Sequence, residues 1–413
     1  MDKVILHSDI NSCYASIELL HHPELRGKPL AVGGDPEARH GIVLAKDQIA
    51  KSFGVKTGMP LWQARNLCPE ITFLPPRMEL YLRFSQMAHE LYREYTDLQQ
   101  PFGIDECWLD VTGTVGIFGS GMDIARAINR RMKEELGITV SIGVSYNKIF
   151  AKLGSDYKKP DAITEITRDN YKDIVWSLPA GDLLYVGRNT KLKLKAMGIY
   201  TIGQLAAMNP FILKRKLGKM GEILHGFANG NDLSEVTREN YNAPIKSIGN
   251  STTTPRDLTC DEDVWIVIYM LAESVAARLR SNGFKAMVVE ISIRDNELFS
   301  FTRQKKVMSP TNITGEIASE AYKLFKGNYS WKKPIRSVGV RASCLVLEKM
   351  PEQTYMFMDA ERRIKQEKID ETLDIIRRRF GYYSIRPAVM YMDSNLSHSN
   401  PAEDHVAHPQ GYF

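Results

Sequence analysis

Three acidic side chains stand at positions from which they could act on one substrate. Asp9 ends an apolar segment that begins at Val4, and Asp105 and Glu106 are adjacent at the crest of a predicted hairpin with apolar flanks. Converging carboxylates repel one another and raise one another's pKa values unless cations neutralise them. Oxygen ligands suit Mg²⁺, and two such ions can bind the attacking and leaving oxygens of a phosphoryl transfer. The three acids therefore favour a metal-dependent phosphoryl-transfer site.

Each acid also has a simpler interpretation. Asp9 could only cap a helix predicted over residues 12–20, because aspartate favours the N-cap position. Asp105 and Glu106 could only be a solvated turn. Taken together, these interpretations do not explain why the apolar residues Cys107 and Trp108 directly follow two adjacent charges. A shared site requires a fold that brings residue 9 to the hairpin.

The elements around the acids predict such a fold. With residues 11–75 set aside as an insertion, the pattern over residues 4–144 is strand, helix, strand, strand, helix, strand. That order is the split βαββαβ arrangement, an antiparallel sheet backed by two helices. In this arrangement the end of the first strand lies beside the hairpin between the second and third strands. The fold class is therefore α+β, with the three carboxylates on one face.

The rest of the chain divides by composition. Residues 166–232 are helical and rich in lysine, and residues 233–244 are polar without an apolar period, which predicts a linker. Residues 245–349 return to strands and helices, and their 16 basic and 11 acidic residues account for the whole chain's net charge of +5. In the extension, residues 350–413, an amphipathic helix is predicted over 361–380 and disorder over the last twenty residues. The apolar residues of that helix are Ile364, Ile369, Leu373, Ile376 and Phe380.

The composition excludes several classes of protein. The 413 residues are 43% hydrophobic and 25% charged, which argues against collagen, coiled coil and general disorder. No apolar run reaches the roughly 18 residues of a membrane span, and the N-terminus does not read as a signal peptide. The five cysteines are scattered without a CxxC pair, so neither a disulfide framework nor a zinc site is expected. We expect a reduced, cytoplasmic protein without a membrane partner.

Three segments resemble one enzyme family. GIDECWLDVTG (103–113), HSDINSCYASIE (7–18) and GVSYNKIFAKLGSDYKKPD (143–161) are similar, in order and spacing, to motifs of the Y-family (translesion) DNA polymerases, most of all the bacterial DNA polymerase IV type. The resemblance extends over about residues 1–345. It implies a right-hand polymerase that carries out low-fidelity, template-directed synthesis past DNA lesions. The implied parts are a βαββαβ palm (1–10 and 76–165), small fingers (11–75), a helical thumb (166–232), a linker (233–244) and an α/β little finger (245–349).

The resemblance also implies roles for single residues. Asp9, Asp105 and Glu106, with the carbonyl oxygen of Ile10, would be ligands of two Mg²⁺ ions. Glu106 would lie nearest the primer 3′-hydroxyl, where its charge favours loss of that proton. The reaction would be in-line attack of this hydroxyl on the α-phosphate of a deoxynucleoside triphosphate.

Four further residues fall on positions that contact the incoming nucleotide in the family. Tyr14 would be the steric gate that leaves no room for a ribose 2′-hydroxyl, although spacing alone favours a core aromatic. Lys159 would reach the triphosphate. Gln48 and Lys51 stand where the family has a tyrosine and an arginine, and lysine lacks arginine's bidentate fork. Two other lysines, Lys148 and Lys152, are interpreted as surface charge.

DNA and a protein partner would be held by other parts. Residues 183–208 resemble a helix-hairpin-helix, which presents backbone N–H groups to a DNA phosphate, with an ordinary helical turn as the alternative. In the basic segment Lys246, Arg303, Lys305 and Lys306 would face phosphates, or else form a solvated face. The segment with Gln353, Met356 and Phe357 resembles the peptide by which bacterial polymerases bind the sliding clamp, or else is a core strand.

Two other functions remain as alternatives. Gly33-Gly34-Asp35 superficially resembles a loop of nucleotide cyclases, but it lies in the insertion, and a cyclase has no use for a basic C-terminal domain. A catalytically silent DNA-binding protein has no need for three crowded acids. We therefore expect a monomeric DNA polymerase.

Overall fold

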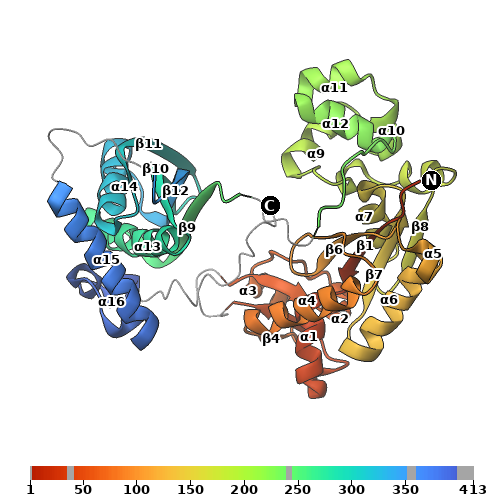
Figure 1. The fold of residues 1–413 in the computed structure, drawn as a ribbon, viewed down its shortest axis with the longest axis horizontal. Helices are drawn as coiled ribbons and strands as arrows, with labels where there is room; N and C mark the ends of the chain where they lie inside the picture. Colours follow the sequence, from red (N-terminus) through yellow and green to blue (C-terminus); the bar gives the residue numbers. More distant parts are fainter. Residues whose placement is uncertain (1, 35–40, 239–243, 351–359, 398–413) are drawn as a thin grey trace. The chain divides into compact units, whose positions relative to one another are not determined.

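The computed structural model describes residues 2–34, 41–238, 244–350 and 360–397. The chain divides into two compact units, one formed by the described residues up to 238 and the other by those from 244 onward. Each unit has its own hydrophobic core. The division falls inside the segment that the sequence predicts to be a linker, and we describe each unit by itself (Figure 1).

A five-stranded sheet forms the centre of the first unit. Its strand order is β5 (Gln99–Pro101), β6 (Glu106–Asp110), β1 (Ile5–Ile10), β7 (Val140–Ser145) and β8 (Ile163–Ile166). The helices that the βαββαβ pattern requires are α4 (Met78–Arg93) and α6 (Gly121–Leu136). Every residue of β1 and β7 is buried, as expected for the middle of a covered sheet. The predicted α+β arrangement is confirmed.

One feature of this sheet departs from the prediction. The sheet is mixed, because β8 pairs parallel to β7 while the other pairs are antiparallel. Helix α7 (Lys148–Tyr157) forms the crossover between the two parallel strands. Strand β8 has only four residues, so its alternation was too short to stand out in the sequence.

Helix α7 approaches the sheet closely at one glycine. A Cβ atom at Gly143 of β7 would lie 1.9 Å from the carbonyl oxygen of Ala151. The N-terminus of α7 is fixed by Asn147, whose side chain accepts a hydrogen bond from the Phe150 amide at 2.8 Å. This close contact brings the lysines of α7 to the central strand.

The insertion forms a small separate layer. Helix α1 (Cys13–His21) follows β1, and a three-stranded sheet has the order β3 (Val43–Lys46), β2 (Leu30–Gly33), β4 (Thr72–Leu74). It is completed by η1 (Pro23–Leu25), α2 (Gln48–Ser52) and α3 (Leu61–Leu67). The insertion has its own small apolar cluster.

The remaining elements of the first unit are helical. A short helix α5 (Val115–Phe118) lies before α6. After β8 come α8 (Tyr171–Val175), η2 (Ala180–Asp182), α9 (Arg188–Ala196), α10 (Ile202–Ala207), α11 (Pro210–Leu217) and α12 (Lys219–Ala228). These helices share one apolar cluster, which agrees with the helical region predicted for residues 166–232.

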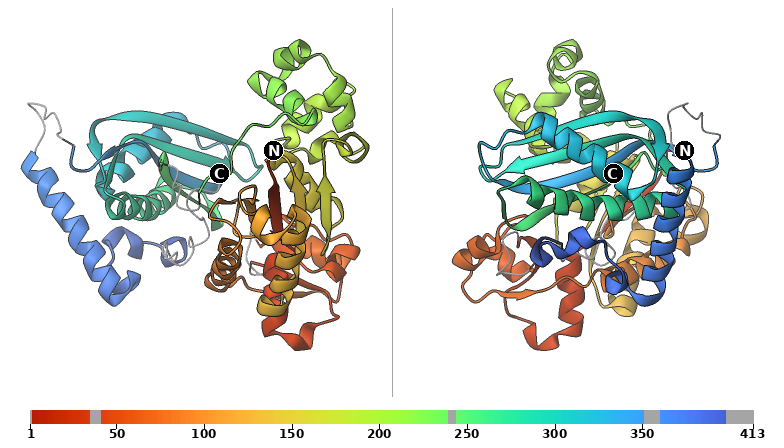
Figure 2. Two further views of the ribbon diagram at one scale, coloured as in Figure 1. Left: turned by 45° about the vertical axis from the view of Figure 1, so that its right-hand side comes forward. Right: turned by 90° about the vertical axis from the view of Figure 1, so that its left-hand side faces the viewer.

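The second unit is a four-stranded antiparallel sheet with helices. The strand order is β11 (Ser300–Thr311), β10 (Phe284–Asp295), β12 (Ile335–Leu347), β9 (Ser247–Leu258). Helices α13 (Asp261–Ser281) and α14 (Thr314–Asn328) cover the same face of this sheet (Figure 2). The unit ends with α15 (Ala360–Phe380), η3 (Tyr382–Ser384), η4 (Ala388–Tyr391) and α16 (Ser394–Ser397).

Candidate active site

The register of the first sheet places two of the three predicted acids opposite each other. Strand β1 pairs with β6 so that Asp9 and Glu106 are direct cross-strand partners. The amide of Ile10 donates a hydrogen bond to the carbonyl oxygen of Asp105 at 2.9 Å. The predicted meeting of residue 9 with the hairpin is therefore present in the backbone itself.

A buried lysine joins the carboxylates. The Nζ atom of Lys152 lies 3.2 Å from Oδ2 of Asp9 and 2.9 Å from Oε2 of Glu106. Its side chain is 13% exposed. The interpretation of Lys152 as surface charge is therefore wrong, because α7 turns this residue toward the sheet and not toward solvent.

A second lysine reaches the same group. Lys159, just after α7, places Nζ 2.5 Å from Oδ2 of Asp9 and 2.7 Å from Oδ1 of Asp156. Asp156 also pairs with Lys152 at 3.1 Å. The ammonium group of Lys159 thus contacts carboxylates in this structure, and its predicted role toward a triphosphate stays a prediction. Lys148 is also buried; it donates to Gln100 Oε1 at 2.7 Å and covers the Trp108 ring.

The carboxylates titrate differently because their surroundings differ. Burial, with the charges of Asp9 and Glu106 added to it, raises the pKa of Asp105 to about 7. Burial also raises the pKa of Asp9, against the opposing charges of Lys152 and Lys159. The pKa of Glu106 is lowered in spite of its burial, because His7 and Lys152 stabilise the charged form. His7 and Lys152 therefore stabilise the charge of Glu106, whereas the smaller opposing contribution of Lys159 leaves the pKa of Asp105 raised.

His7 is a site neighbour that sequence reasoning missed. It lies two residues before Asp9 on the same face of β1, and its side chain is fully buried. Its Nε2 is 3.3 Å from Oε2 of Glu106, and its Nδ1 is 2.8 Å from Oγ of Ser155. Burial lowers the pKa of His7, so the ring is neutral. The sequence signal for this role was the position of His7 inside the first motif. Because side chains alternate along a strand, His7 and Asp9 point to the same face.

The carboxylates offer a ligand set for the predicted cations. Within the described ranges, no three acids, histidines or cysteines are already grouped as a metal site. The donor set nevertheless fits a hard divalent cation, since it consists of oxygens. Burial raises the pKa of Asp105 most, and the negative charges of Asp9 and Glu106 raise it further. A bound cation would relieve this repulsion.

Tyr14 lies on α1 close to the acids. Its ring stacks on that of Tyr81, with 4.3 Å between centroids and 9° between planes. Tyr81 in turn donates to Glu18 at 2.6 Å, and Glu18 is held by Arg77. Burial raises the pKa of Tyr14 to about 12, with smaller contributions from Cys13 and Asp105. The stack fixes the plane of the Tyr14 ring.

The two predicted finger residues lie on α2. Gln48 donates its Nε2 to Ser12 Oγ at 3.2 Å. Lys51 is exposed, and its charge contributes to a lowered pKa of Lys46 after the larger effect of burial. Neither residue contacts the carboxylates directly, and their roles toward a triphosphate stay predictions.

The predicted DNA contacts of the second unit fall on two faces. Side chains alternate along a strand, and Arg303 and Lys305 of β11 pair with the buried Ile291 and Val289 of β10. Both therefore lie on the helix-covered face, where Lys305 contacts Glu320 and Arg303 contacts Asn328 of α14.

Other predicted contacts lie elsewhere. Lys306 pairs with Val288 and lies on the opposite, open face. Lys246 is exposed just before β9. The residues of the predicted clamp peptide, Gln353, Met356 and Phe357, lie outside the described residues.

The palm-like sheet, with acids on its two central strands, defines a polymerase-type fold, and the comparisons agree. A chimeric Y-family DNA polymerase of known structure matches with a TM-score of 0.72, 24% identity, and coverage of 83% of this chain and 99% of its own. Residues 8–156 match the impB/mucB/samB family, and residues 245–355 match the C-terminal domain of that family.

Curated relatives extend over nearly the whole chain. DNA polymerase IV of Acetivibrio thermocellus is 51% identical over 397 residues, which are 96% of this chain and 100% of the relative. DNA polymerase IV 1 of Bacillus subtilis is 38% identical over 387 residues, 93% of this chain and 92% of the relative. The chain belongs to the impB/mucB/samB family of Y-family polymerases, among its DNA polymerase IV members, and the resemblance predicted from the motifs is confirmed.

Two general features follow from the described residues. None of their helices is long and apolar enough to cross a membrane. All five cysteines are free, and three of them, Cys13, Cys68 and Cys107, are buried.

Proposed function

We propose that Asp9, Asp105 and Glu106 form the active site at which this chain extends a primer. Membership of the family makes the chain a template-directed DNA polymerase of the lesion-bypass class. The nucleotide cyclase and silent DNA-binding alternatives are thereby set aside. The assignment of the site to these residues is our own proposal.

One observation carries the assignment. Lys152 bridges Asp9 and Glu106, which are far apart in sequence, and Asp105 is close enough for both to raise its pKa. Asp9 and Glu106 are therefore joined through one lysine, and Asp105 lies within reach of their charges. This is the arrangement that a divalent-cation site for phosphoryl transfer requires.

The residues would divide the reaction as follows. Two Mg²⁺ ions, held by Asp9, Asp105, Glu106 and the Ile10 carbonyl, would supply charge neutralisation for the attacking and leaving oxygens. Glu106, with its low pKa and its contact with His7, would stay charged and favour loss of the proton from the 3′-hydroxyl. Lys159 would exchange its contact with Asp9 for a triphosphate oxygen. Tyr14, fixed by Tyr81, would pack against the sugar and exclude a 2′-hydroxyl.

Primer extension tests the assignment directly. We expect Glu106→Gln to lower the rate of single-nucleotide addition by at least about 100-fold, because it removes a charge that acts on the reacting oxygen. The matched control is Glu165→Gln, an exposed acid on β8 of the same sheet. Full activity in Glu106→Gln, or equal loss in both variants, would show that the site lies elsewhere.

The gate assignment has its own test. Tyr14→Ala should allow ribonucleotide incorporation while deoxynucleotide addition continues. Ser16→Ala, at a partly buried position of the same helix, is the control and should keep the discrimination. Unchanged sugar selectivity in Tyr14→Ala would leave the stacked ring as a core element only.

We propose that DNA lies along the open face of the second unit. Small polar residues line its hollows, namely Ser251, Ser292, Ser300, Thr302 and Ser337. They let a backbone approach closely, and Lys306 adds positive charge, whereas the charge of Arg341 is paired with Glu290 at 2.8 Å. Lys306→Ala should weaken primer-template binding and reduce its salt dependence by about one ion, whereas Lys305→Ala on the helix-covered face should not. If Lys305→Ala weakened binding and Lys306→Ala did not, DNA would lie on the helix-covered face instead.

We further propose a protein partner, a cellular location and an oligomeric state for this chain. The clamp peptide around Gln353, Met356 and Phe357 would dock on the sliding clamp, and Gln353→Ala with Phe357→Ala should abolish clamp-stimulated synthesis only. We also propose a cytoplasmic monomer, in agreement with the free cysteines. A sedimentation mass of one chain checks the monomer.

A further inference from the structure

Helix α15 packs against its own unit through charged residues. Arg363 pairs with Glu316 at 2.8 Å, and Glu367 pairs with Lys285 at 2.9 Å. Asp370 and Asp374 both pair with Arg280, and Arg377 pairs with Glu273 at 2.8 Å. The five helix residues repeat at alternating steps of four and three, the spacing of one helix face. That face is directed at α13, α14 and β10.

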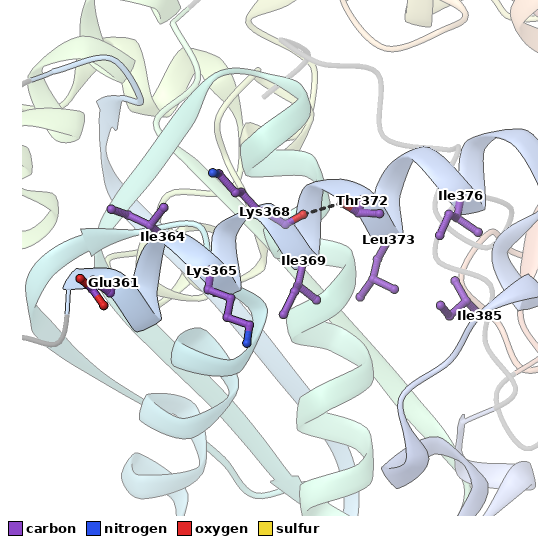
Figure 3. Close-up of a pocket in the computed structure, with 9 residues that line it drawn as sticks. All are labelled: Glu361, Ile364, Lys365, Lys368, Ile369, Thr372, Leu373, Ile376 and Ile385. Atoms are coloured by element: carbon purple, nitrogen blue, oxygen red, sulfur yellow. Dashed lines mark hydrogen bonds between the residues drawn. The ribbon is translucent and has the colours of Figure 1, made fainter.

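The opposite side of α15 carries an apolar groove of about 560 Å³. Figure 3 shows Ile369 and Leu373 projecting on one side of the helix and Ile385, from the segment after η3, approaching Ile376. We call this the α15 groove; its lining residues are Glu361, Ile364, Lys365, Lys368, Ile369, Thr372, Leu373, Ile376 and Ile385.

The apolar residues of the groove are unusually accessible. Ile364 is 52% exposed and Ile369 is 42% exposed. Exposed apolar residues that occur singly are ordinary, but a contiguous apolar groove marks an interaction site. The amphipathic helix predicted from the sequence is therefore confirmed as a helix, but its charged side and not its apolar side packs on the unit.

The charges of the groove are also unmatched. Lys365 and Lys368 lie in its lining, and among the residues that the structure describes neither forms an ion pair. Glu361 is the one acid of the lining. All five charged residues on the opposite side of the helix are paired. The groove thus offers apolar surface beside free positive charge.

We propose that the α15 groove binds an acidic segment with apolar side chains from a partner protein. Apolar side chains of the segment would contact Ile369, Leu373 and Ile376, and its carboxylates would pair with Lys365 and Lys368. A second copy of the chain would bring the same lysines together, which disfavours self-association. A nucleic acid would find no aromatic side chain in the lining on which to stack a base.

The test selects binders without assuming their identity. A displayed library of random 16-residue peptides is panned on the full chain and counter-selected on the Ile369→Asp variant. Selected peptides are then labelled, and their affinities are measured by fluorescence anisotropy. We expect enrichment of peptides that combine Asp or Glu with Leu, Ile or Phe.

The variants separate the groove from the rest of the helix. Ile369→Asp should weaken binding at least about tenfold, since it places a charge in the apolar contact. Lys365→Glu with Lys368→Glu should weaken binding and remove its salt dependence. Ile375→Asp is the matched control, because Ile375 is 61% exposed on α15 and outside the groove lining. Primer extension should be unchanged in all three, and circular dichroism should show intact folding.

Several outcomes would overturn the proposal. These are enrichment of basic or neutral peptides, absence of any enrichment sensitive to Ile369→Asp, or equal weakening by Ile375→Asp. A dimer of the wild-type chain that Ile369→Asp converts to monomer would assign the groove to self-association instead.

Discussion

Charged side chains are buried at two places in the molecule, beneath α15 in the second unit and around Asp9 in the first. Beneath α15, Arg280 lies between Asp370 and Asp374 and also donates to the carbonyl oxygen of Asn312 at 2.7 Å. Around Asp9, two lysines contact carboxylates, yet the pKa of Asp105 stays raised to about 7. Both carboxylates of the first group are paired with Arg280, whereas among the described residues Asp105 of the second group forms no ion pair.

The difference separates a structural use of buried charge from a functional one. A buried ion pair costs desolvation energy, which good geometry and added hydrogen bonds offset, so a matched group can hold two elements in one register. A group with surplus carboxylates keeps a net negative charge, so binding of a cation stabilises it most. The comparison predicts that removing one charge destabilises the matched group and leaves the surplus group folded.

The largest expected effect concerns the matched group. Arg280→Met should destabilise the second unit by about 3–5 kcal/mol, because Asp370 and Asp374 would lose the positive charge that pairs with them. Urea unfolding followed by circular dichroism measures the loss. Arg168→Met, which removes an exposed pair with Asp2, is the control and should cost less than about 1 kcal/mol. Equal effects of the two changes would remove the distinction between buried and exposed pairs.

The sequence predicted the group around Asp9 better than the group beneath α15. Strand alternation and the motifs placed Asp9 beside Asp105 and Glu106 because β1 and β6 are regular strands with one possible register. Lys152 was missed, since its orientation depends on the close approach of α7 to Gly143. The orientation of α15 was missed for a similar reason. An apolar stripe normally faces inward, and only partners distant in sequence, such as Arg280 and Glu273, reverse it.

A smaller effect on stability is expected when a lysine is removed from the group around Asp9. Lys152→Met removes one cation from Asp9 and Glu106. In EDTA this change should lower the free energy of unfolding of the first unit by about 1–3 kcal/mol, which corresponds to a melting temperature lower by a few degrees. Mg²⁺ should restore more stability in this variant than in the wild type, because the carboxylates attract it more strongly. Lys158→Met, an exposed residue after α7, is the control. The same Mg²⁺ response in all three proteins would contradict a cation site at these acids.

A third effect is expected in the pH dependence of stability at Asp105. Its pKa is raised to about 7 in the folded chain by burial and by Asp9 and Glu106, against 3.8 for the free group. The folded chain therefore binds this proton more tightly than the unfolded chain does. The resulting stability is full below about pH 4 and is lost as pH rises through about 7. Asp105→Asn lacks this titration.

The measurement is the difference in melting temperature between Asp105→Asn and the wild type in EDTA. We expect this difference to become more positive between pH 4 and pH 8, since the wild type pays an increasing cost for an ionised, crowded carboxylate. Mg²⁺ should reduce the difference by neutralising that charge. Asp123→Asn, an exposed acid with a lowered pKa at the start of α6, should show a nearly flat difference over this range, because its pKa values in the folded and unfolded chain both lie below it. A flat difference for Asp105→Asn would mean that the three carboxylates do not sense one another.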